Sequence, residues 1–370
     1  MEKRIFLSAP HMGGNELKYI EEVFKSNYIA PLGEFVNRFE ESIKVYTGSQ
    51  NALAVSSGTA ALHLALRVLG IEKGDDVLTS TFTFIGSVTA ILYQQANPVF
   101  IDSDTKSWNL SPTLLETYLK NATKKPKALI VTHLYGMSAE IIKIAEICKK
   151  YKIFLIEDAA ESLGATYQNK HTGTFGDIGI YSFNGNKILT TSGGGMLVTP
   201  NKEWRDKALY YATQTKEPYL HYEHLEYGYN YRMSNVLAAI GVGQMEVIED
   251  RVIKKREIFN WYKEFLSDID EITFMPELPG SRGNRWLTAL TFKTTKYTKV
   301  IKALNDINVE SRPLWKPMHL QPLFRDTKKL TDFTSENLFN HGLCIASSTT
   351  MCKEDVFHIC NTIKKSLSKS

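Results

Sequence analysis

Short apolar runs alternate with amphipathic helical patterns over most of the first two hundred residues. The apolar runs are five to seven residues long, and each ends in a polar residue. Strands that alternate with helices indicate a mostly parallel sheet covered by helices on both faces. The pattern predicts strands at 51–57, 76–80, 97–102, 128–133 and 153–158, with helices at 59–70 and 139–152 between them.

Two helical patterns precede the first of these strands. In each of them the apolar residues share one helix face, and Gly48 follows the second pattern as a stop signal. The residues of the two faces are Leu17, Ile20, Val23 and Phe24, and then Val36, Phe39 and Ile43. Further along, Ser111 followed by Pro112 predicts the N-cap and first turn of a helix.

The pattern changes after residue 200. A long helical stretch covers roughly residues 234–266, and shorter strands and helices follow it at 285–292, 297–305, 309–314 and 343–348, with a closing helix from Lys353. We interpret the chain as a large sheet domain at 1–245, which includes the N-terminal helical segment, and a smaller α+β domain at 246–370.

The composition and charge of the chain argue against several classes of function. The net charge is +4 with scattered basic residues, and the longest basic run, 254–256, lies in a helical pattern that we interpret as a solvated face. This charge pattern argues against binding to nucleic acid or to a membrane surface. The start of the chain lacks a signal-peptide pattern, and the four cysteines form no CxxC pair. We therefore expect a cytoplasmic protein with reduced thiols and no metal site.

Three polar signals fall where the predicted strands end, which is the edge at which open α/β sheets bind ligands. In residues 56–63 a strand ends in Ser-Ser-Gly-Thr and a helix begins, which suits a phosphate but equally a simple helix cap. Asp158 ends another strand and could hold a metal, a ribose or a protonated ring nitrogen, or only cap a helix. Lys187 precedes three glycines at 193–195 and is either a Schiff-base lysine or a surface lysine.

Together the three signals match the handles needed to hold pyridoxal phosphate: a phosphate cradle, a carboxylate for the ring nitrogen and an amine for the aldehyde. Ser182 adds a hydroxyl just before the lysine. Phe84 follows another strand and could stack on the ring, although a buried core aromatic would give the same pattern.

The motifs SGTAALH, TFTF, PVFID, IEDAAE, YSF followed by a lysine, and GYNYRMS occur in this order along nearly the whole chain. In this the sequence resembles the DegT-type sugar-nucleotide aminotransferases, a branch of the fold type I pyridoxal-phosphate enzymes. Within the family it is most similar to the aminotransferase of bacterial bacillosamine synthesis, in segments such as SFNGNKILTTSGGGM and RPLWKPMH. The resemblance implies an aspartate-aminotransferase-like fold with a large, mostly parallel sheet domain and a smaller C-terminal α+β domain.

The resemblance also implies roles for individual residues. Lys187 would bond to the aldehyde carbon of the cofactor, and Asp158 would pair with the ring nitrogen. Ser182, Gly58 and Thr59 would hold the phosphate with Asn230 from a second subunit, while Phe84 and Glu161 would lie against the ring. The residues expected near the sugar nucleotide are Arg312, Trp315, Lys316 and His319.

The implied reaction transfers the amino group of L-glutamate to C4 of UDP-2-acetamido-2,6-dideoxy-4-keto-hexose and releases 2-oxoglutarate. We expect a homodimer with shared active sites. Two alternatives remain: the same chemistry on another nucleotide 4-keto-6-deoxy sugar, for example a GDP-linked one, or a pyridoxal-phosphate-binding regulator without turnover.

Overall fold

A large mixed sheet forms the centre of the computed structural model, which describes residues 4–368; the first three residues of the opening stretch lie outside it. The strand order is β1-β9-β8-β5-β4-β2-β3-β14. All neighbours are parallel except at β9, which runs antiparallel to both β1 and β8. The strands are β1 Asn51–Val55, β2 Asp76–Ser80, β3 Asn97–Ile101, β4 Ala128–Thr132, β5 Phe154–Asp158, β8 Ile178–Ser182, β9 Gly195–Thr199 and β14 Lys329–Leu330.

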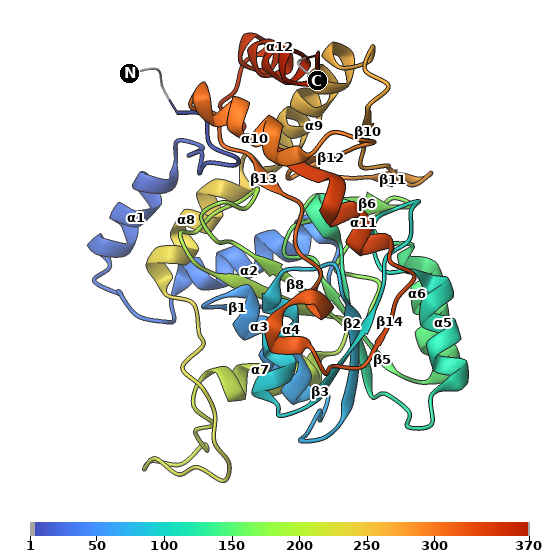
Figure 1. The fold of residues 1–370 in the computed structure, drawn as a ribbon. Coiled ribbons are helices and arrows are strands. Elements are labelled where there is room, and N and C mark those ends of the chain that lie inside the picture. Colours follow the sequence, from blue (N-terminus) through green and yellow to red (C-terminus); the bar gives the residue numbers. More distant parts are fainter. Residues whose placement is uncertain (1–3, 369–370) are drawn as a thin grey trace.

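Helices cover both faces of this sheet (Figure 1). Successive residues of β4 point to opposite faces, so Ile130 packs in the cluster with α3, α4 and α7, while Leu129 and Val131 pack with α5 and α6. The predicted parallel, doubly covered sheet is therefore present. The bounds are α3 Gly58–Val68, α4 Ile85–Tyr93, α5 Pro112–Asn121, α6 Ile141–Tyr151 and α7 Lys202–Ala212.

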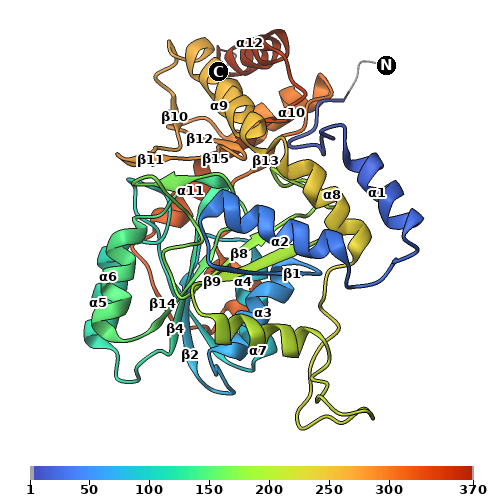
Figure 2. The ribbon, with the colours of Figure 1, turned by 180° about the vertical axis from the view of Figure 1, so that it is seen from behind.

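Three further helices, α1 Glu16–Lys25, α2 Glu34–Thr47 and α8 Asn235–Met245, lie beside the β1 edge (Figure 2). The predicted apolar face of α2 is buried, and Gly48 ends the helix in the left-handed conformation. The predicted face of α1 is only partly covered. Val23 is buried, but Leu17 and Phe24 are 67% and 57% exposed in the single chain.

The C-terminal part forms a second sheet in the order β10-β12-β15-β13, with α9, α10 and α12 packed on it. The helix predicted at 234–266 is in fact two helices, because α8 ends at Met245 and α9 begins at Ile248. The boundary between domains at residue 245 stays a prediction. The bounds are α9 Ile248–Phe265, β10 Ile272–Phe274, β12 Thr288–Phe292, α10 Tyr297–Asp306, β13 Arg312–Pro313, α11 Thr334–His341, β15 Gly342–Ile345 and α12 Lys353–Ser368.

A small three-stranded sheet joins the two parts, with β6 Thr166–Tyr167 between β7 Lys170–His171 and β11 Ser281–Arg282. The prediction for the basic run was wrong at its centre. Lys255 is 2% exposed and lies inside the protein. No helix within residues 4–368 is long and apolar enough to cross a lipid bilayer.

Candidate active site

A cavity of about 500 Å³ opens where several strands of the large sheet end, and residues of the C-terminal part close it. Its lining brings together nine of the twelve residues that the sequence singled out. They are Gly58, Thr59, Phe84, Asp158, Glu161, Ser182, Lys187, Arg312 and Trp315. Asn230, Lys316 and His319 do not border it.

One end of the cavity is the N-terminus of α3. Ser57 caps the helix, since its Oγ accepts a hydrogen bond from the N–H of Ala60 at 3.0 Å. The first N–H groups of a helix have no partner within it, and the helix dipole favours an anion there. The hydroxyls of Thr59 and Ser182 border the same space. The predicted helix cap and the predicted phosphate cradle are thus compatible, because Ser57 caps the helix while its neighbours remain available.

The three glycines after Lys187 differ in what they approach. A Cβ on Gly193 would meet no atom within 4 Å, whereas one on Gly194 would lie 2.3 Å from the Met233 side chain. A Cβ on Gly195 would lie 2.4 Å from the carbonyl group of Ser57, so at Gly195 only glycine leaves room for the backbone that begins α3.

Lys187 lies on the loop between β8 and β9, with a side chain 12% exposed. Its Nζ is 4.0 Å from Glu161 Oε1 and 4.2 Å from the centre of the Trp286 ring. Burial lowers the pKa of Lys187, and the negative charges of Glu161 and Asp158 oppose this shift. Burial likewise raises the pKa of Glu161 to about 7, although Lys187 opposes the shift. An amine in such surroundings is more readily neutral and nucleophilic than a surface lysine.

Asp158 is held at the end of β5 by two hydrogen bonds. The hydroxyl of Ser87 donates to Oδ2 at 2.5 Å, and the N–H of Ala160 donates to Oδ1 at 3.1 Å. A chain of buried hydroxyls continues from Ser87 to Thr83 and Thr132, at 2.9 Å and 2.7 Å along the chain. These hydroxyls orient the carboxylate toward the cavity, and sequence inspection did not single them out.

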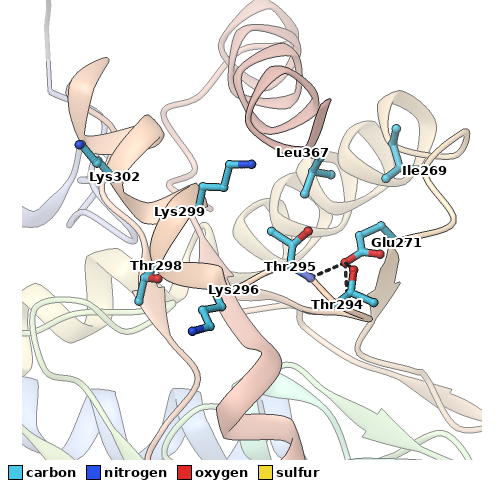
Figure 3. Close-up of a pocket in the computed structure, with 9 residues that line it drawn as sticks. All are labelled: Ile269, Glu271, Thr294, Thr295, Lys296, Thr298, Lys299, Lys302 and Leu367. Carbon is cyan, nitrogen blue, oxygen red and sulfur yellow. Dashed lines mark hydrogen bonds between the residues drawn. The ribbon is translucent and has the colours of Figure 1, made fainter. Parts of the chain in front are cut away.

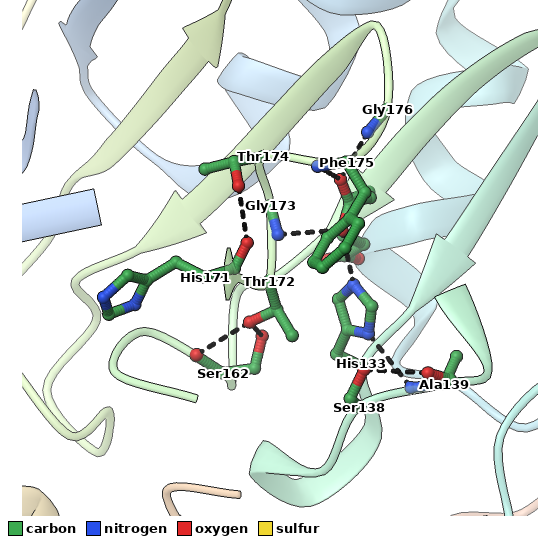
Figure 4. Close-up of polar contacts among 12 residues, drawn as sticks. His133, Ser138, Ala139, Ser162, His171, Thr172, Gly173, Thr174, Phe175 and Gly176 are labelled. Carbon is green, nitrogen blue, oxygen red and sulfur yellow. Dashed lines mark hydrogen bonds and ion pairs between the residues drawn. The ribbon is translucent and has the colours of Figure 1, made fainter. Parts of the chain in front are cut away.

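Glu157, the residue before Asp158, anchors β5 on the opposite face of the sheet. Glu157 accepts backbone hydrogen bonds from Gly173, Phe175 and Gly176, and its Oε2 lies 2.9 Å from His133 Nε2 (Figure 4). Because Ala139 N–H donates to His133 Nδ1, the proton of the ring is on Nε2 and points to Glu157. Neighbouring residues on a strand face opposite ways, so this buried network leaves Asp158 directed into the cavity.

Two aromatic side chains, Phe84 and Trp315, form one wall of the cavity. Phe84, the residue before α4, is 59% exposed and its ring centre lies 5.6 Å from that of Trp315. Tyr135 supports this wall, because its hydroxyl accepts a hydrogen bond from the backbone N–H of Trp315 at 2.9 Å. The N–H of Tyr135 also donates to Glu161 at 2.6 Å. Tyr135 has φ of 53°, a conformation rare for a side chain of this size.

Of the four residues expected at the sugar nucleotide, Arg312 and Trp315 border the cavity and the other two do not. Arg312 borders the cavity, where it pairs with Glu310 at 2.9 Å and has a 66% exposed side chain. Lys316 is exposed to solvent and does not border the cavity. His319 is buried between Thr81 Oγ1 and Glu336 Oε1, at 2.6 Å and 3.0 Å, so it ties the loop after β2 to α11.

Asn230 is exposed on the segment that connects α7 to α8. Its neighbours Tyr229 and Tyr231 stack on one another, with ring centres 4.8 Å apart and an interplanar angle of 12°. Both rings pack beside His63 of α3. Since alternate residues of an extended segment point in opposite directions, Asn230 is directed away from its own chain.

A second cavity, of about 700 Å³, lies between α10 and the end of α12 (Figure 3). Its Glu271 accepts hydrogen bonds from the N–H groups of Thr294 and Thr295 at 2.7 Å and 2.6 Å, which fixes the turn before α10. None of the twelve singled-out residues borders this cavity, so the identification of the active site depends on chemistry and not on size. Within residues 4–368 no group of three or more metal-ligating side chains was found.

The first cavity fits pyridoxal phosphate. A Cβ on Gly58 would lie 3.0 Å from Ser182 Cβ, so the helix N-terminus and the serine are close enough to share one phosphate. A buried carboxylate, a buried amine and an exposed aromatic ring border the remaining space. These groups match the ring nitrogen, the aldehyde and the ring face of the cofactor.

Comparison with known proteins agrees with this chemistry. The family described as DegT/DnrJ/EryC1/StrS aminotransferase matches residues 10–364. The "Putative pyridoxal phosphate-dependent aminotransferase EpsN" of Bacillus subtilis (strain 168) is 48% identical over 363 residues, covering 96% of this chain and 94% of its own. The "GDP-perosamine synthase" of Escherichia coli O157:H7 is 36% identical, with 98% of each chain covered.

Among solved structures, the aminotransferase TlmJ from Streptoalloteichus hindustanus superposes with a TM-score of 0.93 at 26% identity, over 99% of each chain. The predicted fold type I architecture is therefore confirmed. The predicted reaction class and cofactor are confirmed with it. The chain belongs to the DegT/DnrJ/EryC1/StrS aminotransferase family and is a pyridoxal phosphate-dependent sugar aminotransferase.

Proposed function

We propose that this enzyme transfers the amino group of L-glutamate to C4 of UDP-2-acetamido-2,6-dideoxy-4-keto-hexose. The observation that carries the reaction is the placement of the Lys187 amine in the cavity, 4.0 Å from the Glu161 carboxylate. The choice of sugar depends on the resemblance to the bacillosamine branch in SFNGNKILTTSGGGM and RPLWKPMH.

The cofactor would be held by residues at the two ends of the cavity. Gly58, Thr59 and Ser182 would bind its phosphate with Asn230 of the partner subunit, and Phe84 would cover the ring. The Asp158 carboxylate, oriented by Ser87, pairs with the ring nitrogen and favours its protonated form. When bound, pyridoxal phosphate supplies an aldehyde that takes up the amino group and a ring that accepts electrons.

Lys187 would bond to the aldehyde carbon of the cofactor, and the incoming amino donor would free its amine. Its amine then takes the proton from Cα of glutamate and acts as the general base. The surroundings suit this task, since burial lowers the pKa of Lys187. Glu161 stabilises the lysine when it carries the proton, because the two side chains are buried and close together. In the second half-reaction the same amine moves a proton in the reverse direction at C4 of the keto sugar.

The exposed apolar surface supports a homodimer. Besides Leu17 and Phe24 of α1, the segment between α7 and α8 exposes Leu220, Tyr222 and Leu225. This segment projects from the large domain in Figures 1 and 2. Apolar patches of this kind mark protein interfaces. A second copy of the chain would cover them and bring Asn230 toward a neighbouring active site.

At the sugar end, Arg312 would bind the pyrophosphate after release from Glu310, helped by the exposed Lys316. Trp315 would cover an apolar face of the sugar. The expected place of His319 near the substrate is the least supported, because its ring is buried between Thr81 and Glu336. The cytoplasmic location also stays a prediction.

A second candidate substrate is a GDP-linked 4-keto-6-deoxy sugar. It is favoured by the relatives that are named as GDP-perosamine synthases, which are 34–36% identical to this chain. Both candidates use the same chemistry at C4, so they differ in the nucleotide and in the N-acetyl group of the sugar.

The test is kcat/KM for the UDP-linked 4-keto sugar beside its GDP- and dTDP-linked counterparts, with glutamate as donor and product structures determined by NMR. We expect strong discrimination by the nucleotide and the N-acetyl group, because buried polar partners left unpaired cost more than an added hydroxyl in an apolar pocket. A clear preference for the GDP sugar would select the second candidate. Absence of turnover with every one of these sugars would reject both candidate substrates.

A further inference from the structure

Lys255 of α9 is a buried lysine that the proposed reaction does not use. It is 2% exposed, and its Nζ donates hydrogen bonds to Ser8 Oγ at 3.0 Å and to the carbonyl oxygen of Trp286 at 2.9 Å. Within residues 4–368 it forms no ion pair, and burial lowers its pKa to about 7. Placing an amine here is costly compared with an apolar side chain of similar length.

The second partner of this lysine borders the active site. Trp286 is held at three points: its N–H donates to Asn284 at 2.8 Å, Lys255 donates to its carbonyl, and its indole N–H donates to the carbonyl of Asn186 at 2.7 Å. Asn186 is the residue before Lys187. The face of the same indole ring lies 4.2 Å from Lys187 Nζ.

Trp286 therefore touches the reactive lysine in two ways, through the backbone of its neighbour and through its amine. The indole ring covers one side of the amine and, through its hydrogen bond to Asn186, holds the backbone that carries Lys187 in place. A rotation of Trp286 would break both contacts. The hydrogen bond from Lys255 opposes that rotation, because it fixes the backbone carbonyl of Trp286.

We propose that Lys255 is a positioning residue for Lys187 and acts through Trp286. The inference rests on the proposed role of Lys187 as the cofactor-bonding amine, but it does not depend on the identity of the sugar. It also gives a reason for the buried amine, since an apolar side chain could fill the same space but could not hold the Trp286 carbonyl.

The test compares Lys255→Met with Lys254→Met. Methionine keeps the length of the side chain and removes the donor. Lys254 is a matched control, because it lies on the same helix but pairs with Glu257 at the surface. Each variant is labelled with 5-fluorotryptophan as apoprotein, and the Trp286 signal among the five tryptophans is assigned with Trp286→Phe.

We expect K255M to shift the 19F signal of Trp286 and K254M to leave it in place. The rate constant for covalent loading of pyridoxal phosphate onto the apoprotein, followed by absorbance, should fall about tenfold in K255M, which corresponds to about 1.4 kcal/mol. Lys255→Gln, which keeps an N–H donor, should recover part of this rate. The double variant K255M/W286A should load no more slowly than W286A alone, since W286A already removes both contacts through which Lys255 would act.

A Trp286 signal or a loading rate that K255M leaves unchanged would overturn the proposal. If K255M does not fold, Trp286→Ala decides, because a normal loading rate without the indole ring leaves Lys255 nothing to act through. Neither measurement uses glutamate or a sugar, so a wrong substrate in the proposed function leaves this result unaffected. A wrong role for Lys187 is recognised separately, since Lys187→Ala would then load normally.

Discussion

The variant Gly195→Ala tests whether the absence of a side chain at Gly195 is needed to keep the phosphate-binding N-terminus of α3 in place. In Gly195→Ala the new Cβ would lie 2.4 Å from the carbonyl group of Ser57, whereas ordinary contacts begin at 3.4 Å, so the start of α3 or of β9 must move by about 1 Å. Overpacking of this kind costs about 1–3 kcal/mol. The backbone of Gly195 does not need a positive φ, so the collision alone carries the expected effect.

The shift would displace the N–H groups that begin α3. We expect the affinity for pyridoxal phosphate to fall about tenfold to a hundredfold, since each 1.4 kcal/mol lost is about a factor of ten. The assay is a titration of the apoprotein with the cofactor, followed by absorbance, together with the Tm of the apoprotein.

Gly193→Ala is the matched control, because its Cβ would meet no atom within 4 Å. The apoprotein of this variant should melt at the wild-type temperature. The reasoning is refuted if Gly195→Ala binds the cofactor as the wild type does, or if Gly193→Ala lowers the Tm as much as Gly195→Ala.

Four further variants follow from the site. Lys187→Ala should lose the visible absorbance of the lysine–cofactor bond and nearly all turnover; wild-type activity without an added amine would contradict its role. Asp158→Asn should slow both half-reactions in a folded protein, and activity that a chelator removes and a divalent metal restores would refute the pairing with the ring nitrogen. Burial raises the pKa of Glu161 above its ordinary value, so the folded apoprotein binds a proton at this carboxyl more tightly than the unfolded chain and loses stability as the pH rises through the folded pKa. Glu161→Gln should make stability less dependent on pH, measured by urea unfolding at about pH 5 and about pH 8. Mixing inactive Lys187→Ala and inactive Asn230→Asp subunits should restore activity if active sites are shared, and failure despite verified subunit exchange would count against the shared site.

The sequence alone determined the elements and the local chemistry. Periods of two and 3.6 residues are local properties, so the five strands of the first half and the helices α3 and α6 could be predicted within a few residues, whereas α4 was not predicted. The same holds for caps and turns, as at Ser111 and Gly48. The place of Lys187, Asp158 and the start of α3 at strand ends was predictable, because parallel strands end at one edge of a sheet.

Only the tertiary structure decided which distant segments meet. Trp286 reaches Lys187 across about a hundred residues of sequence, and Ser87 reaches Asp158 from another strand connection. No local signal distinguishes Lys255, which is buried, from Lys254, which is at the surface, because a helical pattern of three basic residues does not say which neighbour will pack over it. Periodicity likewise predicted one apolar face on α1 but not that Leu17 and Phe24 on it stay uncovered in the single chain. Burial depends on the packing of whole elements, and that packing is set by contacts far apart along the chain.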